Sequence, residues 1–131
     1  MLNCVGFEVK MNKKEQICSQ FVTSNYYLKK KMTTLGISTK YIAYYYLVDI
    51  MDLLINEDKK VRSFSREVFP FLAGKYQKNG CTVERNIRVI ISSFWDKTLK
   101  KKLQIFWQRE DKPSCCEFIY LIKNYMCKDL I

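Results

Sequence analysis

Apolar residues recur at intervals of three and four positions along most of the chain, which is the spacing of amphipathic helices. The pattern predicts a first helix within residues 13–35, and Gly36 is suited to cap its C-terminus. Residues 39–56 are apolar on almost every side, so we expect a central helix that neighbours contact from several directions. Residues 1–11 alternate only loosely and predict a short strand or an extended arm.

The middle of the chain predicts two helices joined by a short turn. Ser65 is a suitable N-cap for the first of them, and Pro70 near its start costs little because first-turn amides have no intrahelical partners. Residues 78–80 then predict a turn. Within this turn, Asn79 is a good N-cap for a helix that runs to about Trp95.

The end of the chain predicts a short basic helix or turn and then a long amphipathic helix. The basic segment covers residues 97–107, and the stretch Asp111-Lys112-Pro113 ends it. Ser114 and Glu117 form an S-x-x-E capping box at the start of the last helix. Apolar residues follow the box at helical spacing: Phe118, Leu121, Ile122 and Tyr125.

These elements and the composition indicate a folded helical protein. Hydrophobic residues make up 48% of the 131 residues and charged residues 27%, with only four Gly and two Pro. We expect one compact all-α domain of six or seven helices over residues 24–131, containing a helix-turn-helix. Residues 1–23 are expected to form an N-terminal extension, as a strand, an arm or a short helix.

The charge balance favours a polyanionic partner. The formal net charge is +10, from 23 Lys and Arg against 13 Asp and Glu, and such an excess attracts nucleic acid or an anionic membrane surface. Membrane binding through the lysine runs 29–31 or 100–102 is the weaker alternative, because both runs adjoin apolar residues expected in the core. The same net charge is also typical of a protein whose lysines serve only to keep it soluble.

Several classes of function are disfavoured by what the sequence lacks. It has no histidine, no C-x-x-C pair and no glycine-rich phosphate loop, so we expect no metal site, no cofactor and no enzyme activity. We interpret the six cysteines as reduced thiols, because no signal peptide precedes them. No apolar segment is long enough to span a membrane, and the expected location is the cytoplasm.

Residues 80–95 combine a buried and an exposed side on one predicted helix. Four apolar residues lie within about 40° of one line on a helical wheel with about 100° per residue: Val83, Ile87, Ile90 and Phe94. The opposite side and its flanks present these residues: Cys81, Arg85, Arg88 and Ser92, flanked by Thr82, Glu84 and Val89. Arg85 and Arg88 are therefore expected to project outward, one helical turn apart.

The two arginines are candidates for contacts with DNA bases. A planar guanidinium group can donate two hydrogen bonds to O6 and N7 of a guanine in the major groove. The preceding segment has the apolar spacing of the first helix of a helix-turn-helix, with the small residue Ala73 at the expected crossing. The alternative is an ordinary solvated surface, on which Arg85 and Arg88 pair with Glu84 or Glu67.

Several blocks of sequence occur in an order and spacing that together are specific to one family. Two of them are Pro70-x-x-Ala73-x-Lys75-Tyr76 and Val83-Glu84-Arg85-x-Ile87-Arg88. The others are Leu35-Gly36-Ile37 before Tyr44-x-Tyr46-Leu47, Trp95, and Lys112-Pro113-x-x-x-Glu117-Phe118-Ile119. Through these blocks, residues 24–130 closely resemble the C-terminal effector domain of the sporulation-initiation response regulators, the stage zero protein A family of endospore-forming bacteria.

The resemblance implies a six-helix domain that binds promoter DNA through a helix-turn-helix made by its third and fourth helices. The family positions that contact DNA from the recognition helix correspond to Glu84, Arg85 and Arg88. Lys75 matches a basic family position on the preceding helix. This agrees with the helical wheel for both arginines.

The chain departs from the family at several places. Thr82 stands where the family usually has an arginine and Val89 where it has a histidine, which predicts a different target sequence or weaker binding. Residues 1–23 are too short for the family's phosphoacceptor receiver domain, so phosphorylation-driven dimerisation is not expected. The segment between Trp95 and Pro113 is shorter than in the family, where the resemblance places contact with RNA polymerase.

The favoured hypothesis is a sequence-specific, double-stranded DNA-binding transcription regulator. The expected base contacts come from Thr82, Glu84, Arg85 and Arg88. The expected contacts with the DNA backbone come from Lys75, Lys78 and Asn79. RNA polymerase or a related regulator is a further expected partner, and we expect a monomer in solution or a weak homodimer on DNA.

The alternative hypothesis is a stand-alone interaction protein that modulates or antagonises a full-length regulator without binding DNA itself. It is favoured by the departures at Thr82 and Val89. It is also favoured by apolar residues of the extension that could cover a partner surface: Phe7, Val9, Ile17 and Phe21.

Overall fold

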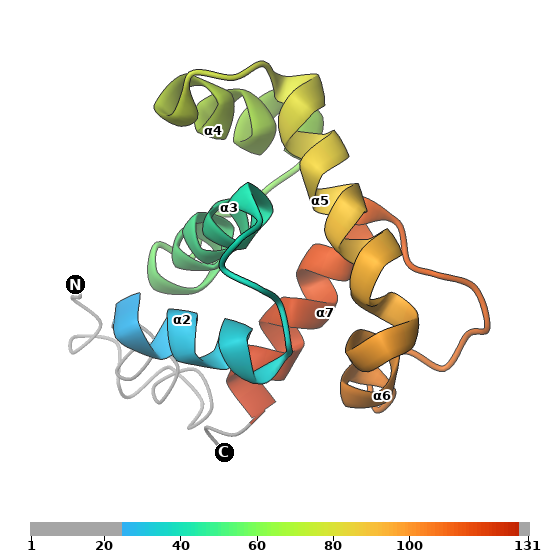
Figure 1. Cartoon of the computed structure of the whole chain (residues 1–131). Coiled ribbons are helices and arrows are strands. Elements are labelled where there is room, and N and C mark those ends of the chain that lie inside the picture. Colours follow the sequence, from blue (N-terminus) through green and yellow to red (C-terminus); the bar gives the residue numbers. More distant parts are fainter. Residues whose placement is uncertain (1–24, 129–131) are drawn as a thin grey trace, which may run out of the picture.

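The part of the chain described by a computed structural model, residues 25–128, consists of helices and loops (Figure 1). These residues contain six α-helices, three π-helical turns (η) and no β-strand. In chain order the elements are α2 (Asn25–Thr34), α3 (Ile42–Met51), η2 (Asp52–Asn56), η3 (Phe64–Val68), α4 (Phe69–Tyr76), α5 (Gly80–Phe94), η4 (Trp95–Leu99), α6 (Lys100–Leu103) and α7 (Cys115–Lys128). The all-α prediction is confirmed, whereas the expected extension 1–23 and its apolar residues lie outside the described residues.

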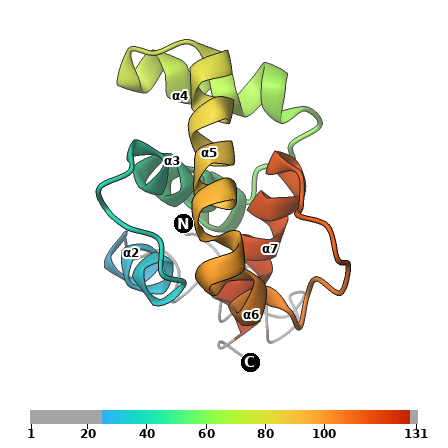
Figure 2. The same ribbon diagram turned by 45° about the vertical axis from the view of Figure 1, so that its right-hand side comes forward.

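Helix α5 runs through the middle of the molecule and contacts α3, α4 and α7. In both ribbon views α4 and the start of α5 form one end of the molecule, while α2 and α6 lie toward the opposite end (Figure 1, Figure 2). The turn at residues 77–79 therefore lies at an end of the fold, together with α4 and the start of α5.

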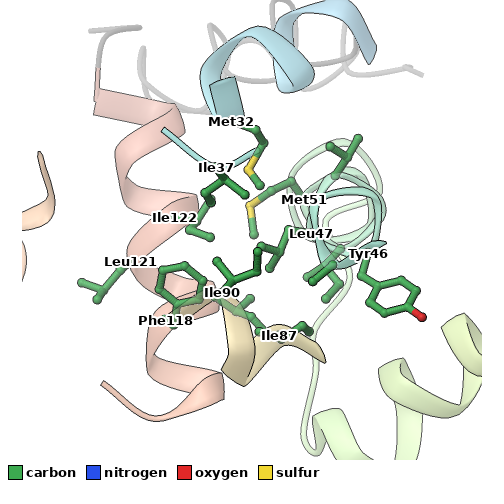
Figure 3. Close-up of a cluster of buried hydrophobic side chains, with 14 of the residues drawn as sticks. Met32, Ile37, Tyr46, Leu47, Met51, Ile87, Ile90, Phe118, Leu121 and Ile122 are labelled. Atoms are coloured by element: carbon green, nitrogen blue, oxygen red, sulfur yellow. The ribbon is translucent and has the colours of Figure 1, made fainter. Parts of the chain in front are cut away.

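All six described α-helices contribute side chains to one core, and Figure 3 shows a part of it that α2, α3, α5 and α7 form. The core residues without exposed surface include Met32, Leu47, Ile87, Ile90, Phe118 and Ile122. Seven of the ten residues of α3 are buried, which confirms the central helix predicted from its apolar pattern. Full burial of each aliphatic side chain contributes about 1.5–3 kcal/mol relative to exposure, so this cluster is the main source of stability.

Gly36 ends α2 as predicted, and the geometry explains the choice of glycine. Its φ is +93°, a left-handed conformation that side chains disfavour. The Gly36 N–H donates to Thr33 O (2.9 Å) and the Ile37 N–H to Met32 O (3.4 Å), which is the Schellman pattern. A Cβ at this position would lie 2.9 Å from Thr98 Oγ1, so glycine also permits close approach of η4 to the end of α2.

The capping box predicted for the last helix is confirmed. The Ser114 N–H donates to Glu117 Oε1 (2.8 Å), and the Glu117 N–H donates to Ser114 Oγ (3.2 Å). Arg109 adds an ion pair to the other oxygen of Glu117 (3.2 Å) and lies over the Trp107 ring. These bonds lower the pKa of Glu117, because the backbone hydrogen bond of Ser114 favours the charged carboxylate.

The prediction that Ser65 caps the next helix is wrong. Ser65 lies inside η3, whose N-cap residue is Ser63. The carboxylate of Glu67 accepts hydrogen bonds from the Arg62 and Ser63 N–H groups, each at 2.9 Å. Glu67 thus holds the N-cap at Ser63, two residues before Ser65, and the helix begins at Phe64. Pro70 does lie in the first turn of α4, as predicted.

The prediction that the helix from residue 80 ends near Trp95 is confirmed, because α5 ends at Phe94. The chain then continues through η4 into α6 without a break. Trp95, Leu99 and Leu103 continue the buried side, with exposures of 1%, 0% and 0%. The Trp95 ring meets Trp107 of the following loop edge to face, with centroids 6.4 Å apart. The start of η4 is therefore stabilised by contact with the loop that follows α6 in the sequence.

Candidate nucleic-acid interface

A turn of three residues joins α4 to α5. Gln77 has left-handed backbone angles (φ 58°, ψ 46°), and the N–H groups of Gln77 and Lys78 both donate to Ala73 O. Ala73 is buried at 6% exposure, which fits the small residue expected where the two helices cross. The contact between α4 and α5 confirms the predicted helix-turn-helix arrangement of two helices, with the turn at residues 77–79 in place of 78–80.

Asn79 caps α5, as predicted. Its side-chain oxygen accepts from the Thr82 N–H (2.8 Å) and from the Thr82 hydroxyl (3.0 Å). The second bond uses the only hydrogen of the Thr82 hydroxyl, so the oxygen of Thr82 is left as an acceptor. The cap thus fixes the first turn of α5 and restricts what Thr82 can offer to a ligand.

The predicted division of α5 into two sides is confirmed. The inner face, defined here by its four most buried residues, has exposures of 0–4%: Val83, Ile87, Ile90 and Ile91. The outer face consists of five exposed residues: Cys81, Arg85, Arg88, Val89 and Ser92. Thr82 and Glu84 are half-buried on the two flanks, and Phe94 is only partly buried.

The two outward arginines differ in their surroundings. Arg88 forms an ion pair with Glu84, with 3.0 Å between Nη2 and Oε2, while 61% of its side chain remains exposed. The hydrogen bond and the charge of Glu84 raise the pKa of Arg88, so its guanidinium stays protonated. No carboxylate within residues 25–128 forms an ion pair with Arg85.

The pairing of Arg88 with Glu84 agrees in part with the alternative of a solvated surface. An exposed ion pair one helical turn apart contributes about 0.3–0.5 kcal/mol, because water screens both charges. A ligand with two good acceptors can therefore compete for Arg88 at little cost. The pair with Glu67 that was the other alternative is not formed, since Glu67 caps η3.

Lys75 has a partner that local sequence could not indicate. Its Nζ lies 3.0 Å from Asp49 Oδ2, and the Tyr76 hydroxyl donates to the same oxygen at 2.7 Å. Asp49 belongs to α3, 26 residues before Lys75. Burial, followed by the hydrogen bond to Asp49, raises the pKa of Tyr76, so the phenol remains neutral. This cluster fixes α4 to α3 beside the turn.

The predicted site residues lie around the start of α5. Lys78 and Asn79 are exposed in the turn, next to Thr82 in the first turn of α5. Arg85 and Arg88 follow on the outer face, with Glu84 beside Arg88. Lys75 is exposed on α4 but is joined to Asp49. The fold therefore gathers all seven residues along α4, the turn and the first half of α5.

Three of the described cysteines, Cys81, Cys115 and Cys116, carry free thiols. Cys81 and Cys116 are exposed, whereas Cys115 is buried. Burial, together with nearby Cys116 and Glu84, raises the pKa of Cys115 to about 12, so this thiol is protonated at neutral pH. Within the described residues, no three His, Cys, Asp or Glu side chains gather as a metal site would require.

The lysines of the two runs, residues 29–31 and 100–102, differ in exposure. Lys29, Lys30 and residues 100–102 are exposed. Lys31, in contrast, is buried at 9% exposure with its Nζ 4.7 Å from the centre of the Tyr125 ring. None of the helices between residues 25 and 128 has both the length and the apolar composition to cross a membrane.

Comparison with known proteins places the chain in a family. The family model described as sporulation initiation factor Spo0A C terminal matches residues 28–126, which is most of the chain. The matched range contains the helix-turn-helix and every predicted site residue. No curated protein matches the chain.

Proposed function

The chain belongs to the family of the Spo0A C-terminal domain, a family of DNA-binding regulatory domains and not of enzymes, and from that premise we propose a sequence-specific transcription regulator. In this proposal α5 is the recognition helix and lies in the major groove of double-stranded DNA. The observation that carries it is the pair of exposed arginines on the outer face, one of them without a carboxylate partner in residues 25–128. A helix whose other face is fully packed can present such groups in a fixed orientation.

Arg85 and Arg88 are the proposed guanine contacts. Arg85 is free to donate two hydrogen bonds to O6 and N7 of one guanine. Arg88 has five N–H donors and can share them between a base and Glu84, or exchange Glu84 for the base. A Glu84 carboxylate released in this way accepts a hydrogen bond from the amino group of a cytosine, and the Thr82 oxygen is a further acceptor.

Lys75, Lys78 and Asn79 are the proposed backbone contacts. The ammonium group of Lys75 has three donors, so it can keep Asp49 and still bind a phosphate oxygen. Lys78 and Asn79 lie immediately before the N-terminus of α5, where backbone N–H groups and the helix dipole favour an anion. These contacts hold the helix in register without distinguishing sequences.

The proposed partner is double-stranded DNA in the cytoplasm. RNA polymerase or a related regulator is a further proposed partner. The protein is proposed to be a monomer in solution or a weak homodimer on DNA. Affinity should fall steeply with salt, because binding releases counterions from the phosphates.

Selection of bound duplexes from a random pool tests the proposal. The purified protein should enrich a defined sequence containing guanines, and the variant Arg85→Ala with Arg88→Ala should enrich none. A matched control is Lys29→Ala with Lys30→Ala, which removes the same charge from exposed positions of α2 at the other end of the molecule.

Two results would count against the proposal. One is the absence of any enriched sequence at physiological salt. The other is enrichment that does not depend on the two arginines. If no duplex is bound but a stable complex forms with a related regulator, the alternative of an interaction protein replaces this proposal.

A further inference from the structure

The outer face of α5 has two different flanks on either side of Arg85. With about 100° per residue, Val89 is displaced by about 40° to one side of Arg85 and Arg88 by about 60° to the other. The Arg88 flank is charged, because Glu84 lies beside it. The Val89 flank is neutral, since Thr82 lies two turns before Val89 on nearly the same line and its hydroxyl is bonded to Asn79.

Val89 is the large hydrophobic residue that α5 exposes. Its side chain is 41% exposed, whereas Val83, Ile87 and Ile90 are fully buried. An exposed valine is not unusual by itself. What distinguishes Val89 is its place, one turn after Arg85 on the face that the proposed function directs toward base edges.

The chemistry of the major groove restricts what Val89 can contact. Valine has no donor or acceptor, so it forms no hydrogen bond with a base edge or a phosphate. Over a polar base edge it would remove water from groups that need hydrogen bonds, which is unfavourable. The C5 methyl group of thymine is the apolar feature that a base pair presents in this groove.

We propose that Val89 is a specificity residue that packs against the C5 methyl group of a thymine near the guanine contacted by Arg85. This inference rests on the proposed function and adds a base preference to it. Four residues of helix span about 6 Å, which is close to two base-pair steps when α5 follows the groove. The side chain is β-branched and has one strongly preferred rotamer in a helix, so little freedom is lost on contact.

Replacing thymine by deoxyuridine tests the contact, because this change removes only the methyl group. In a duplex enriched by the protein, each thymine is replaced in turn and the dissociation constant is measured. At one position we expect roughly fourfold weaker binding, as burial of one methyl group predicts. Val89→Ala should bind the thymine and deoxyuridine duplexes equally while keeping the guanine preference that depends on Arg85.

Ser92→Ala is the matched control, because Ser92 is an exposed residue of the same outer face. It should retain the difference between thymine and deoxyuridine. The inference is overturned if no thymine methyl group affects binding, or if the effect persists unchanged in Val89→Ala. Either result leaves an arginine-dependent guanine preference intact, whereas loss of all discrimination by the wild-type protein would overturn both this inference and the proposed function.

Discussion

The inner and outer faces of α5 are built from the same fifteen-residue helix, yet different forces hold their side chains in place. On the inner face, aliphatic residues at 0–4% exposure pack against α3, α4 and α7. On the outer face, Arg85 and Arg88 are exposed and make at most one ion pair among the described residues. Stability and the proposed recognition of DNA therefore depend on different faces of one helix, and substitutions on one face should leave the property of the other face intact.

Ile87→Ala should have the largest effect on stability, because it breaks the inner face. Ile87 has no exposed surface and lies beside Ile90 and Phe118 in the core (Figure 3). Loss of a buried isoleucine side chain together with the cavity left behind should lower the free energy of unfolding by about 2–5 kcal/mol. Urea unfolding followed by circular dichroism measures this change.

The matched outer-face substitution Ser92→Ala should change the free energy of unfolding by no more than about 0.5 kcal/mol. If Ile87→Ala and Ser92→Ala lowered the free energy of unfolding equally, the inner face would contribute no more to stability than the outer face. Any Ile87→Ala protein that remains folded should keep its preference among duplexes.

Asn79→Ala should have the next largest effect, and it acts on both faces. The Asn79 side chain holds the first turn of α5, from which Thr82 and the arginines follow. Loss of an N-cap should lower the free energy of unfolding by about 1 kcal/mol. Because the first turn also frays, DNA discrimination should weaken. Asn79→Ser keeps a capping oxygen and should restore both the free energy of unfolding and the discrimination between DNA sequences. If serine does not restore them, loss of the cap is not the cause.

Asp49→Asn should have a smaller effect, confined to the connection between α3 and α4. The carboxylate of Asp49 accepts from Lys75 and Tyr76, and the Lys75 side chain is 53% exposed while that of Asp49 is 22% exposed. The free energy of unfolding should fall by less than about 1 kcal/mol, as measured by urea unfolding. A loss as large as that of Ile87→Ala would mean that this pair, and not the inner face, organises the end of the fold that contains α4.

Glu117→Gln should have the smallest effect and leave both faces of α5 unchanged. The pKa of Glu117 is lowered below its ordinary value of 4.5, first by the backbone hydrogen bond of Ser114. Its contribution to stability is therefore present above pH 4.5 and lost as the pH falls through the folded-state pKa. The wild-type melting temperature should drop more between pH 6 and about pH 3 than that of Glu117→Gln. Identical drops would contradict this role for the capping box.

Local rules were enough to predict the features of α5 and α7 that depend on neighbours in sequence. The cap at Asn79, the capping box at Ser114 and the two faces of α5 each follow from spacings of three or four residues. Such contacts lie within one turn of helix, so the sequence contains both partners side by side.

Contacts between distant segments could not be predicted in the same way. Asp49 reaches Lys75 across 26 residues, and Trp107 supports Trp95 from the following loop. For these two contacts the deciding partner depends on how the chain packs, and periodicity carries no information about that. The misplaced start of η3 is a different case, because Glu67 selects Ser63 from only four residues away, and two nearby serines were both suitable caps.

We propose that Arg85 and Arg88, on the outer face of α5, discriminate between DNA sequences. The most direct measurement compares binding of an enriched duplex and its scrambled counterpart at physiological salt, for the wild type, Arg85→Ala with Arg88→Ala, and Lys29→Ala with Lys30→Ala. We predict that the arginine variant binds both duplexes equally, having lost roughly 1–3 kcal/mol of discrimination per arginine, while the lysine variant keeps the wild-type ratio. An arginine variant that retains the wild-type ratio would contradict the account.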